Sequence, residues 1–111
     1  MMNIALTSSI NCARHWGLKS LQAAFPDYGF TDTELQTCPV EVRAPEATRS
    51  RKRTIRLRGV CRCHKFDIKV LLRKQPDNTW PILVIVGILD DIAFDQGALD
   101  RPTEWGVSVP Q

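Results

Sequence analysis

Residues 54–74 read TIRLRGVCRCHKFDIKVLLRK and alternate between apolar and charged side chains. An alternation with a period of two is typical of strands that bury one face. We therefore expect two antiparallel strands joined by a tight turn at His64-Lys65. The residues expected on the inward face are Ile55, Leu57, Cys61, Cys63, Phe66, Ile68, Val70 and Leu72, whereas Arg56, Arg58, Arg62, Asp67, Lys69 and Arg73 are expected to point outward.

The flanking segments predict a third strand and an N-terminal helix. Residues 80–89 follow a turn-forming QPDN segment and are apolar on both faces, as a central, covered strand is. Residues 10–25 carry apolar side chains at three- and four-residue spacings, which indicates an amphipathic helix that ends at Pro26. A short helix is expected to begin at Thr31 or Asp32 and to end before Pro39.

Together these segments predict an α+β fold. An N-terminal helix packs on a three-stranded antiparallel β-meander, and a short acidic helix or loop from Asp90 or Asp91 leads to a C-terminal tail. The length of 111 residues fits a single domain, 1–111. Residues 40–43 alternate as a short edge strand would, and residues 44–53 are expected to form an exposed basic connection.

The sequence also predicts an intracellular protein, cytoplasmic or nuclear, without a membrane partner. The first residues lack the basic region of a signal peptide, and the longest apolar run, residues 80–89, covers only about half of a bilayer as a helix. The run RSRKR at 49–53 is typical of a nuclear-localisation signal. Without an export signal, the four cysteines are expected to stay reduced or to bind metal.

Positive charge is concentrated in one segment. The net charge of the chain is +3, but residues 49–74 carry eleven Lys and Arg side chains against one acid, Asp67, and the acids gather on either side. Such a block repels itself unless an anion lies nearby, either the acidic C-terminal third of the chain or a separate partner.

A basic strand pair suggests binding of nucleic acid, because Lys and Arg near phosphates release counterions and give sequence-independent affinity. No aromatic residues are interleaved for base stacking, so contact with the backbone is expected, with RNA as the favoured partner. The simpler alternative is a solvated charged face that keeps the domain soluble. The predicted binding residues are Arg51, Lys52 and Arg53 as a flexible extension, and Arg56, Arg58, Arg62, Lys69 and Arg73 on the hairpin face.

The predicted order of helix, three strands and short helix resembles that of double-stranded RNA-binding domains. In that family the last helix begins with lysines that contact phosphate, whereas DDIAFD stands at 90–95 here. The general character of the chain also resembles small viral accessory proteins, including silencing suppressors. This resemblance implies the alternative of a protein-interaction module whose basic face meets an acidic host protein.

The segment CRCH at 61–64 raises the possibility of structural zinc, which prefers thiolate and imidazole ligands. The candidate ligands are Cys38, Cys61, Cys63 and His64. The spacing Cys-x-Cys departs from the usual Cys-x2-Cys, so the alternative is that Cys61 and Cys63 are buried core residues and that no cofactor is bound. No catalytic constellation is visible, and an enzyme is not expected.

Overall fold

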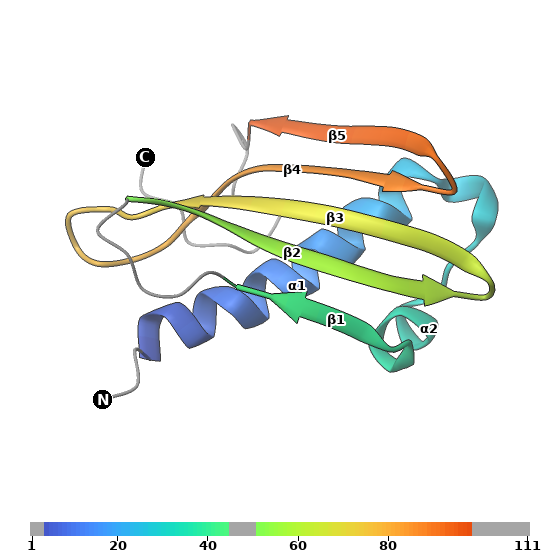
Figure 1. Ribbon diagram of the computed structural model, residues 1–111, viewed down its shortest axis with the longest axis horizontal. Coiled ribbons are helices and arrows are strands. Elements are labelled where there is room, and N and C mark those ends of the chain that lie inside the picture. Colours follow the sequence, from blue (N-terminus) through green and yellow to red (C-terminus); the bar gives the residue numbers. More distant parts are fainter. Residues whose placement is uncertain (1–3, 45–50, 99–111) are drawn as a thin grey trace.

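The computed structural model describes residues 4–44 and 51–98, and the side chains of residues 10–44 and 51–95. Figure 1 shows two layers, with the five strands side by side and the long helix crossing behind them. The elements, in chain order, are α1 (Ile4–Ala24), the 3-10 turn η1 (Pro26–Tyr28), α2 (Asp32–Thr37), β1 (Val40–Arg43), β2 (Lys52–Cys61), β3 (His64–Arg73), β4 (Ile82–Leu89) and β5 (Ile92–Ala98).

The sheet is antiparallel throughout, and its spatial order, β1-β2-β3-β4-β5, is the order of the chain. The α+β class and the N-terminal helix are confirmed. The sheet has five strands and not the predicted three, because β1 pairs with one edge of the central meander β2-β3-β4 and β5 pairs with the other. The edge strand at 40–43 had been anticipated, but β5 had not.

The prediction of a short acidic helix or loop after β4 is wrong, because the chain turns back as a hairpin at Asp90 and Asp91 and continues as β5. Both residues have positive φ, 48° and 68°, which places them in a tight two-residue turn of the kind that suits the twist of paired strands. Asp favours both helix N-termini and left-handed turn positions, so its presence alone did not decide between them. With β5 in place of a last helix, the resemblance to double-stranded RNA-binding domains no longer holds.

The first hairpin also turns two residues earlier than predicted. Arg62 and Cys63 occupy the turn, again with φ of 48° and 68°, and Cys61 pairs directly with His64. His64 and Lys65 therefore belong to β3. Cys63 is exposed at the turn and does not share the inward face with Cys61, which is buried.

The core lies between α1 and the inward faces of the strands, where the predicted apolar residues of β2 and β3 are buried. Gly17 brings the helix close to the sheet, since a Cβ there would lie 2.5 Å from Leu57 Cδ1 and 3.3 Å from Val70 Cγ2. The buried hydrophobic residues are Ala13, Leu18, Leu21, Phe30, Leu35, Ile55, Leu57, Cys61, Phe66, Ile68, Val70, Leu72, Trp80, Ile82, Ile85 and Leu89.

Helix α2 begins as the sequence predicts. The Thr31 hydroxyl accepts a hydrogen bond from the Glu34 amide at 3.1 Å, and the Glu34 carboxylate accepts one from the Thr31 amide at 3.0 Å. This reciprocal capping satisfies two amides that the first turn leaves without helical partners. The helix ends at Thr37, and the extended backbone of its C-cap, Cys38, suits the proline that follows.

Within residues 4–44 and 51–98, no helix has the length and apolar character needed to cross a membrane. The predicted basic connection is shorter than 44–53, because Lys52 and Arg53 are already part of β2. Residues 45–50 of that connection and the C-terminal tail from residue 99 lie outside the described residues.

Candidate nucleic-acid interface

The side chains of β1, β2 and β3 that alternate with the core residues point away from α1, onto the face of the sheet that lies toward the viewer in Figure 1. We call this surface the outward face. On these three strands it carries two carboxylates, Glu41 and Asp67, against seven cations: Arg43, Lys52, Arg56, Arg58, Lys65, Lys69 and Arg73.

Three of these cations form a row across the strands. Arg43 on β1 pairs with Arg56 on β2, which in turn pairs with Lys69 on β3. Directly opposed residues on one face have Cβ atoms about 5 Å apart, and like charges in such positions destabilise a sheet. The row therefore needs nearby negative charge, either from this chain or from a bound anion.

Asp67 supplies part of that charge. Arg56 donates to it from Nε at 2.9 Å and from Nη2 at 2.5 Å, and Arg58 Nε lies 3.8 Å from the same carboxylate. The hydrogen bonds from Arg56 hold the pKa of Asp67 below its ordinary value, and they raise the pKa of Arg56. One carboxylate thus serves two guanidinium groups, and an excess of positive charge stays on β2.

Glu41 forms an ion pair with Arg43 on its own strand, with Arg43 Nε 2.5 Å from Glu41 Oε1. The hydrogen bond from Arg43 lowers the pKa of Glu41. By contrast, no hydrogen bond or ion pair joins the side chains of Lys69 or Arg73 to any residue that the structure describes, and both are exposed. These two cations of the predicted site are therefore accessible to a ligand.

Arg62, which was predicted on this face, is placed elsewhere. Its guanidinium pairs with Glu34 Oε2 at 2.5 Å, donates to the carbonyl oxygen of Tyr28 at 2.9 Å, and lies 4.8 Å from the centre of the Phe30 ring. The side chain thereby attaches the tip of the first hairpin to η1 and α2. Its role is structural, because its hydrogen-bonding capacity is directed at the protein itself.

Arg53 is a second correction. It is the second residue of β2 and points inward, with only 6% of its surface exposed and its guanidinium 4.8 Å from the centre of the Trp80 ring. It cannot form part of a flexible basic extension. Arg51 and Lys52, the other two residues of that predicted extension, are exposed, and Lys52 points outward.

The chain matches no protein-family model, no curated protein and no solved structure. The geometry of its own residues is accordingly what supports a functional proposal.

The four predicted zinc ligands do not form one cluster. Cys63 is exposed at the turn, and His64 Nδ1 lies 2.5 Å from Asp90 Oδ2. Cys38 and Cys61 are neighbours, and burial raises the pKa of the Cys38 thiol, which disfavours the thiolate that zinc requires. In the described part of the chain, no group of three or more His, Cys, Asp or Glu side chains could hold a metal ion.

Two cations of the outward face were missed from the sequence. Arg43 could not be assigned because the pairing of β1 with β2 was unknown, and only that pairing sets Arg43 opposite Arg56. Lys65 was taken as a turn residue, although it continues the alternation of Asp67 and Lys69 on β3 and could have been found from that pattern.

The rest of the outward face differs in chemistry. On β4 and the adjoining part of β3 it is apolar, with Leu71, Val84, Val86 and Ile88, and no aromatic residue occupies an outward position on the described strands. A surface of this kind can hold the charged backbone of a polyanion, but it offers no platform on which bases could stack.

Proposed function

We propose that the protein binds nucleic acid, RNA foremost, by holding the phosphate backbone against the outward face of β1–β3. The row of Arg43, Arg56 and Lys69 is the observation that carries this proposal. Glu41 and Asp67 pair with Arg43 and Arg56, whereas no ion pair joins Lys69 to a residue that the structure describes. A phosphate backbone would supply the negative charge that is still missing there, and Arg and Lys are the residues that most often contact phosphate.

The proposed binding is electrostatic and weakly specific for sequence. Because no aromatic residue lies outward on the described strands, contacts to the backbone of a duplex are favoured over stacking on single-stranded bases. The role is that of a binding protein and not of an enzyme.

Salt titration of RNA binding with single variants tests the proposal. Each of Lys69→Gln and Arg73→Gln should weaken binding to a short RNA duplex and reduce the slope of log K against log salt by about one. Arg62→Gln is the matched control, since it removes the same charge from a side chain that Glu34 holds. Affinity that hardly changes with salt, or an equal loss of slope in all three variants, would contradict the proposal.

A variant with the opposite sign sharpens this test. Asp67→Asn frees Arg56 and Arg58 from their shared carboxylate and should therefore strengthen RNA binding. Asp27→Asn adds the same net charge on the exposed η1 turn and should leave the affinity close to that of the wild type. Weaker binding by Asp67→Asn would argue against the outward face as the site, provided that thermal unfolding shows the variant to be folded.

The apolar strip on β3 and β4 favours one second candidate, a protein-interaction module. An acidic partner with an apolar stripe could cover Leu71, Val84 and Val86 together with the neighbouring cations. Retention of a single protein from cell extract after nuclease treatment, together with a loss of that retention in Val86→Lys, would support this candidate over nucleic acid.

A further inference from the structure

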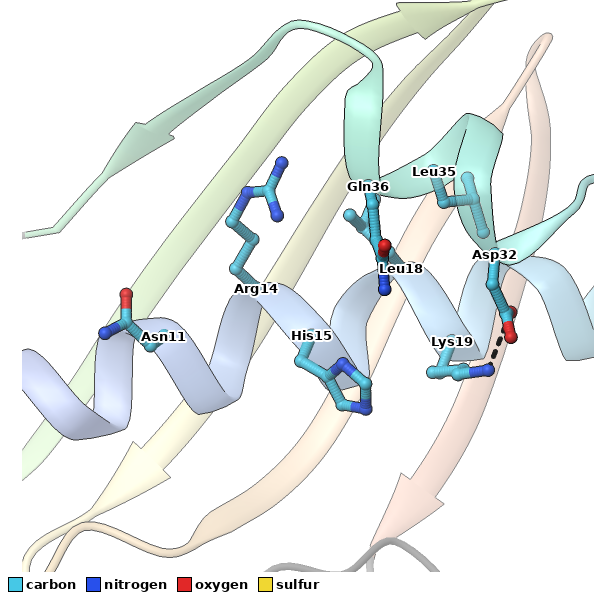
Figure 2. A pocket seen from close by; sticks show the side chains of 8 residues that line it. All are labelled: Asn11, Arg14, His15, Leu18, Lys19, Asp32, Leu35 and Gln36. Atoms are coloured by element: carbon cyan, nitrogen blue, oxygen red, sulfur yellow. Dashed lines mark hydrogen bonds and ion pairs between the residues drawn. The ribbon is translucent and has the colours of Figure 1, made fainter.

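A cavity of about 340 Å³ lies between α1 and α2, on the side of the molecule away from the outward face. This volume is at the lower end of the range for small-molecule sites. Figure 2 shows Gln36 reaching from α2 toward α1, with Arg14 on one side of it and Lys19 and Asp32 on the other. The lining residues are Asn11, Arg14, His15, Leu18, Lys19, Asp32, Leu35 and Gln36.

The α1 residues of this cavity lie on one stripe of the helix because they follow three- and four-residue spacings. Leu18 and Leu35, which are 4% and 3% exposed, give the cavity an apolar floor. Asn11 and Gln36 add amide groups to the lining. The site therefore combines an apolar surface with a few polar groups, as small-molecule sites do.

The charges in the cavity are unequal. Lys19 Nζ lies 2.7 Å from Asp32 Oδ1, and this hydrogen bond lowers the pKa of Asp32, so the two charges compensate each other. Arg14 is half-buried, and no carboxylate forms an ion pair with it among residues 10–44 and 51–95. Besides the imidazole of His15, the cavity thus holds one cation without a carboxylate partner among the described residues, Arg14, whose partial burial makes an anionic partner favourable.

We propose that this cavity binds a small organic carboxylate. Arg14 would hold the carboxylate through its planar pair of N–H donors, while the apolar body of the ligand rests on Leu18 and Leu35. A monoanion matches the one arginine charge that no described carboxylate pairs with, and inorganic phosphate has no apolar body to rest on the two leucines. The site is independent of the proposed nucleic-acid interface, because it lies on the helical side of the molecule.

NMR titration of the full chain with benzoate tests this proposal. Benzoate should shift amide signals of residues 11–19 and 32–36 saturably. Benzamide, which has the same shape without the charge, should bind at least about tenfold more weakly than benzoate. A tenfold loss is the equivalent of one charge-assisted hydrogen bond. Inorganic phosphate should perturb the same residues more weakly than benzoate.

Variants of Arg14 identify the anchor. Arg14→Gln should reduce benzoate affinity about tenfold, and Arg14→Lys should bind with intermediate affinity because it keeps the charge but loses the planar pair of donors. Lys74→Gln, an exposed cation outside the cavity, should bind as the wild type does. The proposal is overturned by the absence of saturable benzoate shifts at these residues, by unchanged affinity in a folded Arg14→Gln, or by phosphate binding there more tightly than benzoate.

Discussion

Asp67 sets how much positive charge the outward face presents. Its carboxylate holds Arg56 and approaches Arg58, and the hydrogen bonds from Arg56 keep the pKa of Asp67 below its ordinary value. A carboxylate whose pKa is lowered by folding stabilises the folded state at pH values above its ordinary pKa. This stabilisation is lost as the pH falls through the lowered pKa. At neutral pH, Asp67 is therefore ionised and competes with any phosphate for the same two arginines.

Arg53 shows how different a cation becomes when its strand position turns it inward. Arg53→Ala should lower the free energy of unfolding by about 1–3 kcal/mol, because it removes both the packing of the aliphatic stem and the cation–π contact with Trp80. Urea denaturation measures this loss.

Arg51→Ala is the matched comparison, two residues earlier and exposed. It should change stability by no more than about 0.5 kcal/mol. If Arg51→Ala proved as costly as Arg53→Ala, the inward placement of Arg53 would be wrong.

At the scale of the elements, the sequence predicted the parts whose signals are local. The alternation in residues 54–74 gave β2 and β3, and Thr31 with Glu34 gave the start of α2. The second hairpin turn was missed because Asp90 and Asp91 suit a helix cap as well as a turn with positive φ. For the same reason β5 was not predicted: without a turn at Asp90 and Asp91, the sequence gives no sign that the next residues pair with β4.

The candidate site was predictable to a similar extent. The outward direction of Arg56, Arg58, Lys69 and Arg73 follows from alternation alone. The fate of Arg62 does not, because its acceptor carbonyl on Tyr28 is 34 residues away in the chain. Tertiary contacts decide which of the predicted cations are accessible. Because such contacts leave no local signal in the sequence, the accessibility of each cation could not be predicted.

The close packing of α1 on the sheet depends on a glycine. Gly17→Val should destabilise the protein by about 1–3 kcal/mol through overpacking, since Leu57 and Val70 occupy the space that a side chain would need. Thermal or urea denaturation measures the change.

Ala23→Val introduces the same residue on the exposed side of α1 and controls for the helix propensity of valine. It should cost less than about 1 kcal/mol. Equal losses in the two variants would show that α1 does not approach the sheet at Gly17.

For the molecule as a whole, the two layers separate two kinds of surface. The helical side carries α1, α2 and the cavity around Arg14, while the outward face of the sheet passes from cationic on β1–β3 to apolar on β4. Because the inward residues are committed to the core, the outward side chains can be changed with little effect on the fold. This separation is what makes single-residue tests of binding interpretable.

NMR mapping of a bound RNA duplex tests the central claim most directly. Titration at low salt should shift the amide signals of Arg43, Arg56 and Lys69 and of their neighbours on β1–β3, and added salt should reverse these shifts. Signals of α1 should stay in place. RNA-induced shifts confined to the helical side, or the absence of any shift on β1–β3 at low salt, would contradict the claim that this face holds the phosphate backbone.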